Sequence, residues 1–175
     1  MALMNQWRLV TSDGEAQMKR SITFIVPGEP QGKQRARVVF AGGRARAFTP
    51  DKTVSYQDRV RAAFFRAVDL SGEKWKPADC AAVDITAYYG VPASWSKRKQ
   101  QQAIDGEIYP RRKPDLDNVA KAVLDALNGF AYTDDACVIA ISMWKRFGDP
   151  GVRVSITRNN DVLERHFGKG YSVSQ

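Results

Sequence analysis

The sequence predicts an α+β domain with a mixed, largely antiparallel sheet and helices packed on one face. Four segments have the composition of main strands, two longer segments have helical periodicity, and a small hairpin follows the first strand. Because each helix is apolar on one side, the stable arrangement covers one face of the sheet with helices. At 175 residues with 43% hydrophobic content, the chain is long enough for one buried core.

The predicted strands are short segments rich in β-branched residues. They comprise residues 22–26, 81–89, 136–144 and 152–157, with residues 38–40 and 46–48 pairing as the small hairpin. Residues 136–144 are apolar on both faces, which is typical of a central strand or of one buried at a dimer interface. The turn at residues 148–151 predicts that residues 152–157 form its hairpin partner.

Helix-initiating residues predict the first helix and a short one. Thr49 suits the capping position of the first helix and Pro50 its first helical position, and the apolar spacing continues to about Val68. Ser94 or Ser96 suits the cap of the short helix.

The second long helix is expected after Pro114. Its apolar stripe runs from Leu116 to Leu127 with helical spacing, and Gly129 follows as a stop signal. Either Asp115 or Asp117 can cap its first turn, where free backbone N–H groups favour a carboxylate.

The same region carries a surplus of acids. One carboxylate would suffice for capping, yet Asp115 and Asp117 are both present, and a second pair, Asp134 and Asp135, precedes the next strand. Two or three carboxylates satisfy Mg²⁺, which keeps several of its waters and lowers their pKa. The short connection brings the acidic pair to the far end of the helix, so the sequence leaves open how the acids meet.

Lys121 lies one turn inside this helix and has two interpretations. It can stabilise negative charge that develops on a phosphate. Alternatively, it forms a surface ion pair with Asp117 or Asp125, which share its helix face.

Charge indicates the partner. Lys and Arg number 27 against 19 Asp and Glu, a net charge of +8, which favours nucleic acid. A single histidine, His166, argues against a zinc site or a serine triad. Two isolated cysteines are typical of a reduced cytoplasmic protein, and no segment resembles a membrane span.

The basic residues predicted to contact DNA lie in the glycine-rich segment after the first strand, in the short helix and just before the acidic motif. They are Lys33, Arg35, Arg37, Arg44, Arg46, Lys97, Arg98, Lys99, Arg111, Arg112 and Lys113. The competing interpretation is that these charges are solvated, or only offset the neighbouring acids.

The acidic motif resembles that of the RusA-type Holliday-junction resolvases, small enzymes of bacteria and their prophages. The likeness rests on the run Asp115-Leu-Asp-Asn118, Lys121, Asp125-Ala-Leu127 and the pair Asp134-Asp135. The stretches from Val26 to Arg35 and Phe48 to Pro50 resemble prophage-type members, and the likeness covers residues 21–158.

This resemblance implies a homodimer that cuts four-way DNA junctions symmetrically in a bacterial or phage-infected cell. It implies Asp115, Asp117 and Asp135 as metal ligands, Asp134 as a further candidate, and Lys121 as catalytic helper. The expected ion is Mg²⁺, with Mn²⁺ as an alternative. Residues 1–20 are expected to be an N-terminal extension and residues 159–175 a tail.

Two other functions fit the sequence. A non-catalytic DNA-binding protein with an incidental acidic cluster accounts for the charge equally well. An RNA nuclease with similar metal chemistry rests only on the generality of that chemistry. Lys121 and the doubled acids favour the DNA nuclease.

Overall fold

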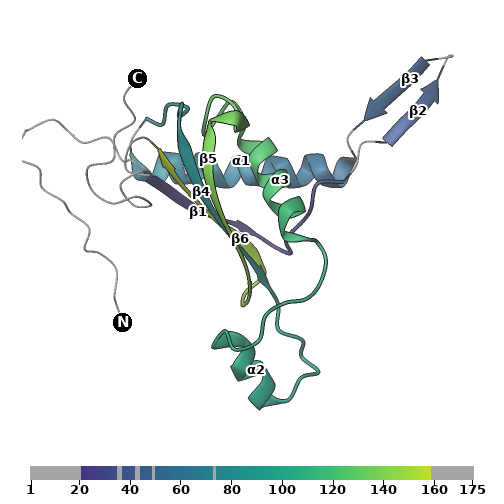
Figure 1. Ribbon diagram of the computed structural model, residues 1–175, viewed down its shortest axis with the longest axis vertical. Coiled ribbons are helices and arrows are strands. Elements are labelled where there is room, and N and C mark those ends of the chain that lie inside the picture. Colours follow the sequence, from purple (N-terminus) through teal and green to yellow (C-terminus); the bar gives the residue numbers. More distant parts are fainter. Residues whose placement is uncertain (1–20, 35–36, 42–43, 49, 73, 159–175) are drawn as a thin grey trace, which may run out of the picture.

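The computed structural model describes residues 21–34, 37–41, 44–48, 50–72 and 74–158. The predictions for residues 1–20 and 159–175 therefore lie outside the described residues. Within the described part, a four-stranded sheet is covered on one face by two helices (Figure 1). This confirms the predicted α+β class.

The sheet is mixed and mostly antiparallel. Its strand order is β1-β6-β4-β5, with β4 and β5 parallel and the other neighbours antiparallel. The strands are β1 (Ser21–Pro27), β4 (Ala81–Tyr89), β5 (Val138–Phe147) and β6 (Gly151–Arg158). On β4, Val83, Ile85 and Ala87 face the helices and are buried, as their alternation predicts.

The prediction that β5 and β6 form a hairpin is wrong, because β4 lies between them. Two sheet positions are separated by about 9–10 Å, a distance that the three residues 148–150 can cross. A hydrogen bond of 3.0 Å, donated by Gly148 N–H to Tyr89 O, stabilises this crossing. Residues 148–150 do connect β5 to β6, but these two strands are not neighbours in the sheet.

β5 is also not a central strand, since it forms the edge of the sheet in the described part of the chain. It begins at Val138, two residues later than predicted. The delay arises because the Asp134 carboxylate accepts the Ala136 N–H over 2.9 Å and starts a 3₁₀ turn, Asp135–Cys137, before the strand.

Helices α1 (Asp51–Ser71) and α3 (Leu116–Leu127) pack on each other and on the sheet (Figure 1). Pro50 lies just outside α1 rather than at its first helical position, and Thr49 is outside the described residues. The short helix α2 (Lys97–Ile104) is capped by Ser96, whose hydroxyl accepts the Lys99 N–H over 3.4 Å.

The core lies between the helices and the sheet. Its largest fully buried side chains include Tyr56 and Phe64 of α1, Ile85 of β4 and Leu127 of α3. Complete burial of such a side chain stabilises the fold by about 1.5–3 kcal/mol. The core thereby fixes the direction of α3, whose polar face carries the predicted site.

Two elements lie apart from this core. The hairpin of β2 (Arg37–Ala41) and β3 (Arg44–Phe48) pairs as predicted and projects from the body of the molecule (Figure 1). At the other end, α2 protrudes below the sheet in the same view. The basic residues of the hairpin and of α2 are thus placed on projections rather than on the core.

Candidate active site

The acids of the central motif lie at the start of α3. Asp115 occupies the capping position with extended backbone (φ −68°, ψ 153°), but its side chain makes no capping hydrogen bond. The exposed carboxylate instead accepts a hydrogen bond from Lys113 Nζ over 2.6 Å. Asp117, in the first turn, is exposed as well. Capping therefore does not account for these two acids.

Positive charges hold Asp115 in its ionised form. The hydrogen bond from Lys113 lowers the pKa of the Asp115 carboxyl, and the charges of Lys113 and Lys145 lower it further. In return, the hydrogen bond to Asp115 and its charge raise the pKa of Lys113, with Asp117 contributing. The start of α3 therefore offers anionic oxygen ligands beside ammonium groups.

Lys145 is a member of this site that sequence reasoning missed. Its Nζ donates to Arg112 O over 2.7 Å, and Tyr89 Oη donates to Pro114 O over 3.2 Å. These two hydrogen bonds connect residues 112–114, just before α3, to the end of β5 through Lys145 and to the end of β4 through Tyr89. The alternation of side chains along β5 could have identified it. Lys145 is on the same face of the strand as Ile141 and Met143, the face that is turned toward the helices.

Asp134 and Asp135 lie at the opposite end of α3. Burial raises the pKa of the Tyr132 hydroxyl, and the charges of Asp135 and Asp125 raise it further. That hydroxyl donates to Leu124 O in the last turns of the helix over 2.7 Å. A helix of 12 residues is about 18 Å long. Asp115 and Asp135 therefore lie near opposite ends of a helix of about this length.

The acids consequently do not close into one cluster within a single copy. Among the described residues, no three His, Cys, Asp or Glu side chains lie close enough together to hold a metal ion. The structure brings Asp115 and Asp117 together at one end of α3 and Asp134 and Asp135 at the other. One Asp134 oxygen already serves as the cap of the 3₁₀ turn.

The segment after β1 lies over the same helix. Lys33 N–H donates to Asn118 O over 3.1 Å, and the Lys33 ammonium forms an ion pair with Asp125. The backbone approaches so closely that a Cβ on Gly32 would lie 3.0 Å from Pro114 Cβ and 3.1 Å from Asn118 Cβ. The absence of a side chain on Gly32 thus permits the loop to pack closely on α3, which places Lys33 on the polar face of this helix.

Comparison with known proteins identifies the family of this chain. The family model described as "Endodeoxyribonuclease RusA" matches residues 27–157, which include all the segments just described. The chain belongs to the RusA endodeoxyribonuclease family. It is an endodeoxyribonuclease of a family whose members resolve Holliday junctions by hydrolysing phosphodiester bonds. A curated relative, "Uncharacterized protein YqaN" of Bacillus subtilis (strain 168), is 32% identical over 143 residues, covering 77% of this chain and 94% of the relative.

The basic residues predicted to contact DNA have different surroundings in this RusA-family protein. Lys97, Arg98, Lys99, Arg44 and Arg111 are exposed. Three others are ion-paired: Lys33 with Asp125, Lys113 with Asp115, and Arg112 with Glu29 over 2.7 Å. Arg37 and Arg46 occupy the hairpin strands, and their side chains, like Arg35, lie outside the described residues.

Lys121 makes no ion pair within the described part of the chain, although both Asp117 and Asp125 lie one turn away. Asp125 is occupied by Lys33. The surface-pair interpretation of Lys121 is therefore not realised, and its exposed ammonium group can reach a ligand. No helix among the described residues of the RusA-family chain could cross a membrane.

The close approach at Gly32 gives a testable expectation. Gly32→Ala forces the loop away from Pro114 and Asn118, which should lower the free energy of unfolding by about 1–3 kcal/mol. Gly90→Ala is the matched control, because its Cβ would meet its nearest neighbour, Pro150, at an ordinary 3.5 Å. Urea unfolding measures both variants, and equal midpoints would contradict the close contact.

Proposed function

We propose that this protein is a metal-dependent, structure-selective endodeoxyribonuclease that resolves Holliday junctions by paired, symmetric cleavage in recombination and repair. The observation that carries the proposal is the pair of exposed, non-capping carboxylates Asp115 and Asp117 beside Lys113 and Lys145. In a protein of net charge +8, an acidic site of this kind suits a cation that in turn meets phosphate.

The donor chemistry fits Mg²⁺, with Mn²⁺ as the alternative. Asp115 and Asp117 supply oxygen ligands, and Asp135 is proposed as the third carboxylate, with Asp134 as a further candidate. When bound, the ion lowers the pKa of a coordinated water and polarises the scissile phosphate. The hydrogen bond from Lys113 lowers the pKa of Asp115 and so stabilises the charged form, which is the form that binds a metal ion.

We propose that the site is completed in a homodimer. A single copy places Asp135 and Asp115 near opposite ends of α3. The edge strand β5 joins these two ends. Its outer edge is unpaired within the described residues, and Ile139 and Ile141 on it are 52% and 44% exposed. A second copy packed along β5 would cover these residues and could bring its Asp135 to Asp115 and Asp117 of the first. A two-fold dimer also provides two equivalent sites for paired cuts.

Lys121 is proposed as the catalytic helper. It lies on the same helix face as Asp117, one turn further along, and carries no ion pair in the described structure. Its ammonium group would stabilise negative charge that develops on the phosphate during hydrolysis. The neighbouring Lys33 adds positive charge to this face, partly neutralised by Asp125.

The role of Lys121 predicts a separation of chemistry from binding. Lys121→Gln should lower the single-turnover rate of junction cleavage by about 10²-fold, the usual scale for one lost charge-stabilising group. Junction affinity should change by no more than a few-fold. Lys74→Gln, an exposed lysine in the loop after α1, removes the same charge elsewhere. Equal rates for the two variants would exclude Lys121 from the reaction.

The alternative is a junction-binding protein without catalytic activity. The absence of a three-acid group among the described residues of one copy is the observation that favours it. The two functions separate when binding is measured first without metal and Mg²⁺ or Mn²⁺ is then added to the preformed complex. The nuclease proposal requires the bound junction to be cut, whereas a complex that persists uncut with either ion supports the alternative.

A further inference from the structure

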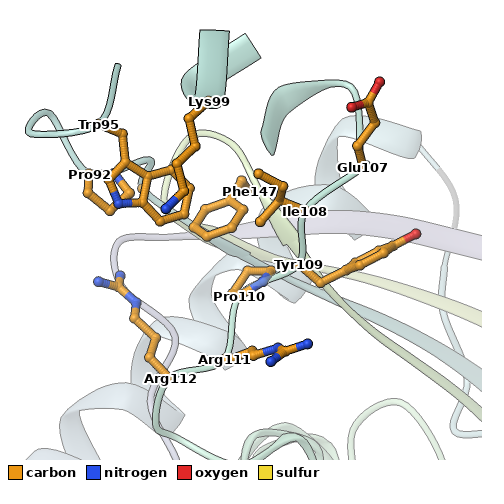
Figure 2. Close-up of a pocket in the computed structure, with 11 residues that line it drawn as sticks. Pro92, Trp95, Lys99, Glu107, Ile108, Tyr109, Pro110, Arg111, Arg112 and Phe147 are labelled. Atoms are coloured by element: carbon orange, nitrogen blue, oxygen red, sulfur yellow. The ribbon is translucent and has the colours of Figure 1, made fainter. Parts of the chain in front are cut away.

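A pocket of about 540 Å³ is lined in part by Arg111 and Arg112, the residues just before the acidic motif (Figure 2). It is formed by the loop before α2, by α2 itself, by the end of β5 and by the segment that leads into Lys113 and Asp115. Its volume is within the usual range for small-ligand sites. The peptide segment that forms one wall therefore continues directly into the acidic motif.

Aromatic and proline rings form the apolar part of this pocket. The rings of Trp95 and Phe147 meet edge to face with their centroids 5.4 Å apart, and both side chains are partly exposed. Figure 2 shows these two rings with Pro110 below the Phe147 ring, and all three residues line the pocket. A flat, apolar ligand would find a stacking surface here.

Cations line the same pocket. The Lys99 ammonium lies 4.0 Å from the centroid of the Trp95 ring. Arg111 and Arg112 also line the pocket, and Figure 2 shows them below the Trp95 and Phe147 rings. Arg112 is held by Glu29 and lies over the Tyr89 ring, whereas Arg111 makes no ion pair within the described residues. The pocket is thus lined by three cations, Lys99, Arg111 and Arg112, and one acid, Glu107, a balance that favours an anion beside the rings.

We propose that this pocket binds one unpaired nucleotide of a DNA strand, its base stacked on Trp95 and its phosphate held by Lys99 and Arg111. This inference deepens the proposed function, on which it rests: the strand to be cut would present one base, taken out of its stack, next to the phosphates at the centre of the junction. Base stacking on aromatic side chains combined with cations along the backbone is the general mode of single-strand binding. The pocket would hold the strand as its next phosphate passes the acids at the start of α3.

A purely structural interpretation of these residues exists. Lys99 is four residues after Trp95 in the chain. In this interpretation, its cation–π contact with the Trp95 ring does nothing more than stabilise the start of α2. That interpretation predicts that loss of the Trp95 ring weakens binding of every DNA backbone equally, or not at all. Stacking predicts that the loss depends on the presence of bases.

The test is therefore a comparison of two single strands in the absence of divalent metal, so that no cleavage is involved. Fluorescence anisotropy would measure binding of a short oligothymidylate and of an abasic strand of the same length. Trp95→Ala should weaken oligothymidylate binding about tenfold and leave the abasic strand unchanged within about twofold. Trp95→Phe, which keeps a ring, should recover most of the loss.

Trp144→Ala is the matched control, because Trp144 is a 54% exposed tryptophan that does not line this pocket. It should leave oligothymidylate binding unchanged, and circular dichroism would verify that each variant is folded. Equal affinities of wild type and Trp95→Ala for oligothymidylate would overturn the proposal, as would the same loss on both strands. A protein that discriminates in this way but never cuts junctions would retain the pocket and lose only the nuclease proposal.

Discussion

Asp117→Asn is expected to lower junction cleavage by more than about 100-fold while leaving junction binding intact or tighter. A lost metal ligand should cost more than the 10–100-fold typical of groups that only orient ligands. Binding should not suffer, since the substitution removes a negative charge that repels phosphate from an exposed position in the first turn of α3. Single-turnover cleavage and anisotropy on the same labelled junction measure the two effects.

Asp69→Asn is the matched control for this experiment. Asp69 is an exposed acid in the last turn of α1, so its substitution changes the net charge equally without touching α3. Cleavage by this variant should remain within about twofold of wild type. Cleavage by Asp117→Asn at the wild-type rate would remove Asp117 from the proposed site.

A mixed dimer of Asp117→Asn and Asp135→Asn subunits is expected to regain cleavage that neither variant has alone. If each site combines Asp117 of one copy with Asp135 of the other, both lesions fall in one site and the second site is intact. The mixed dimer should therefore nick one strand of the junction rather than make paired cuts. Sites confined to one copy would both be damaged, and the mixture would stay inactive.

The control is a mixed dimer of Asp117→Asn with Asp115→Asn. These acids lie together at the start of α3, so each lesion damages a different site and no cleavage should return. Co-expression with two affinity tags gives the mixed species. Sedimentation showing only monomer at micromolar concentration would contradict the dimer itself.

Most of the local structure is predictable from the sequence, whereas the order of the strands is not. Alternation on β4 and the apolar stripe of α3 reflect burial, which acts on each segment separately. The pairing of β6 depends on where other strands lie, and a three-residue turn is equally suited to a hairpin or to a crossing over β4. Because the two strands are consecutive in the sequence, a hairpin was predicted, whereas in the structure the connection crosses over β4.

The candidate site shows the same division. The motif around Asp115 and Asp117 is local, and the family resemblance that it suggested is confirmed by the family match. Lys145 reaches the site only because β5 runs back along α3, and the pocket arises only because the end of β5 meets the loop before α2. Contacts between distant segments such as Trp95 and Phe147 leave no periodic signal in the sequence. The ligand role of Asp135 stays a prediction.

The most direct test of the central claim is cleavage of a labelled synthetic four-way junction, with and without Mg²⁺, beside a linear duplex of the same sequence. The account predicts nicks at two symmetry-related positions of the junction, in the presence of metal only, and none in the duplex. Equal cutting of both substrates would keep the nuclease chemistry and contradict the junction selectivity. A junction that is bound tightly but not cut with either Mg²⁺ or Mn²⁺ would contradict the catalytic site at the start of α3.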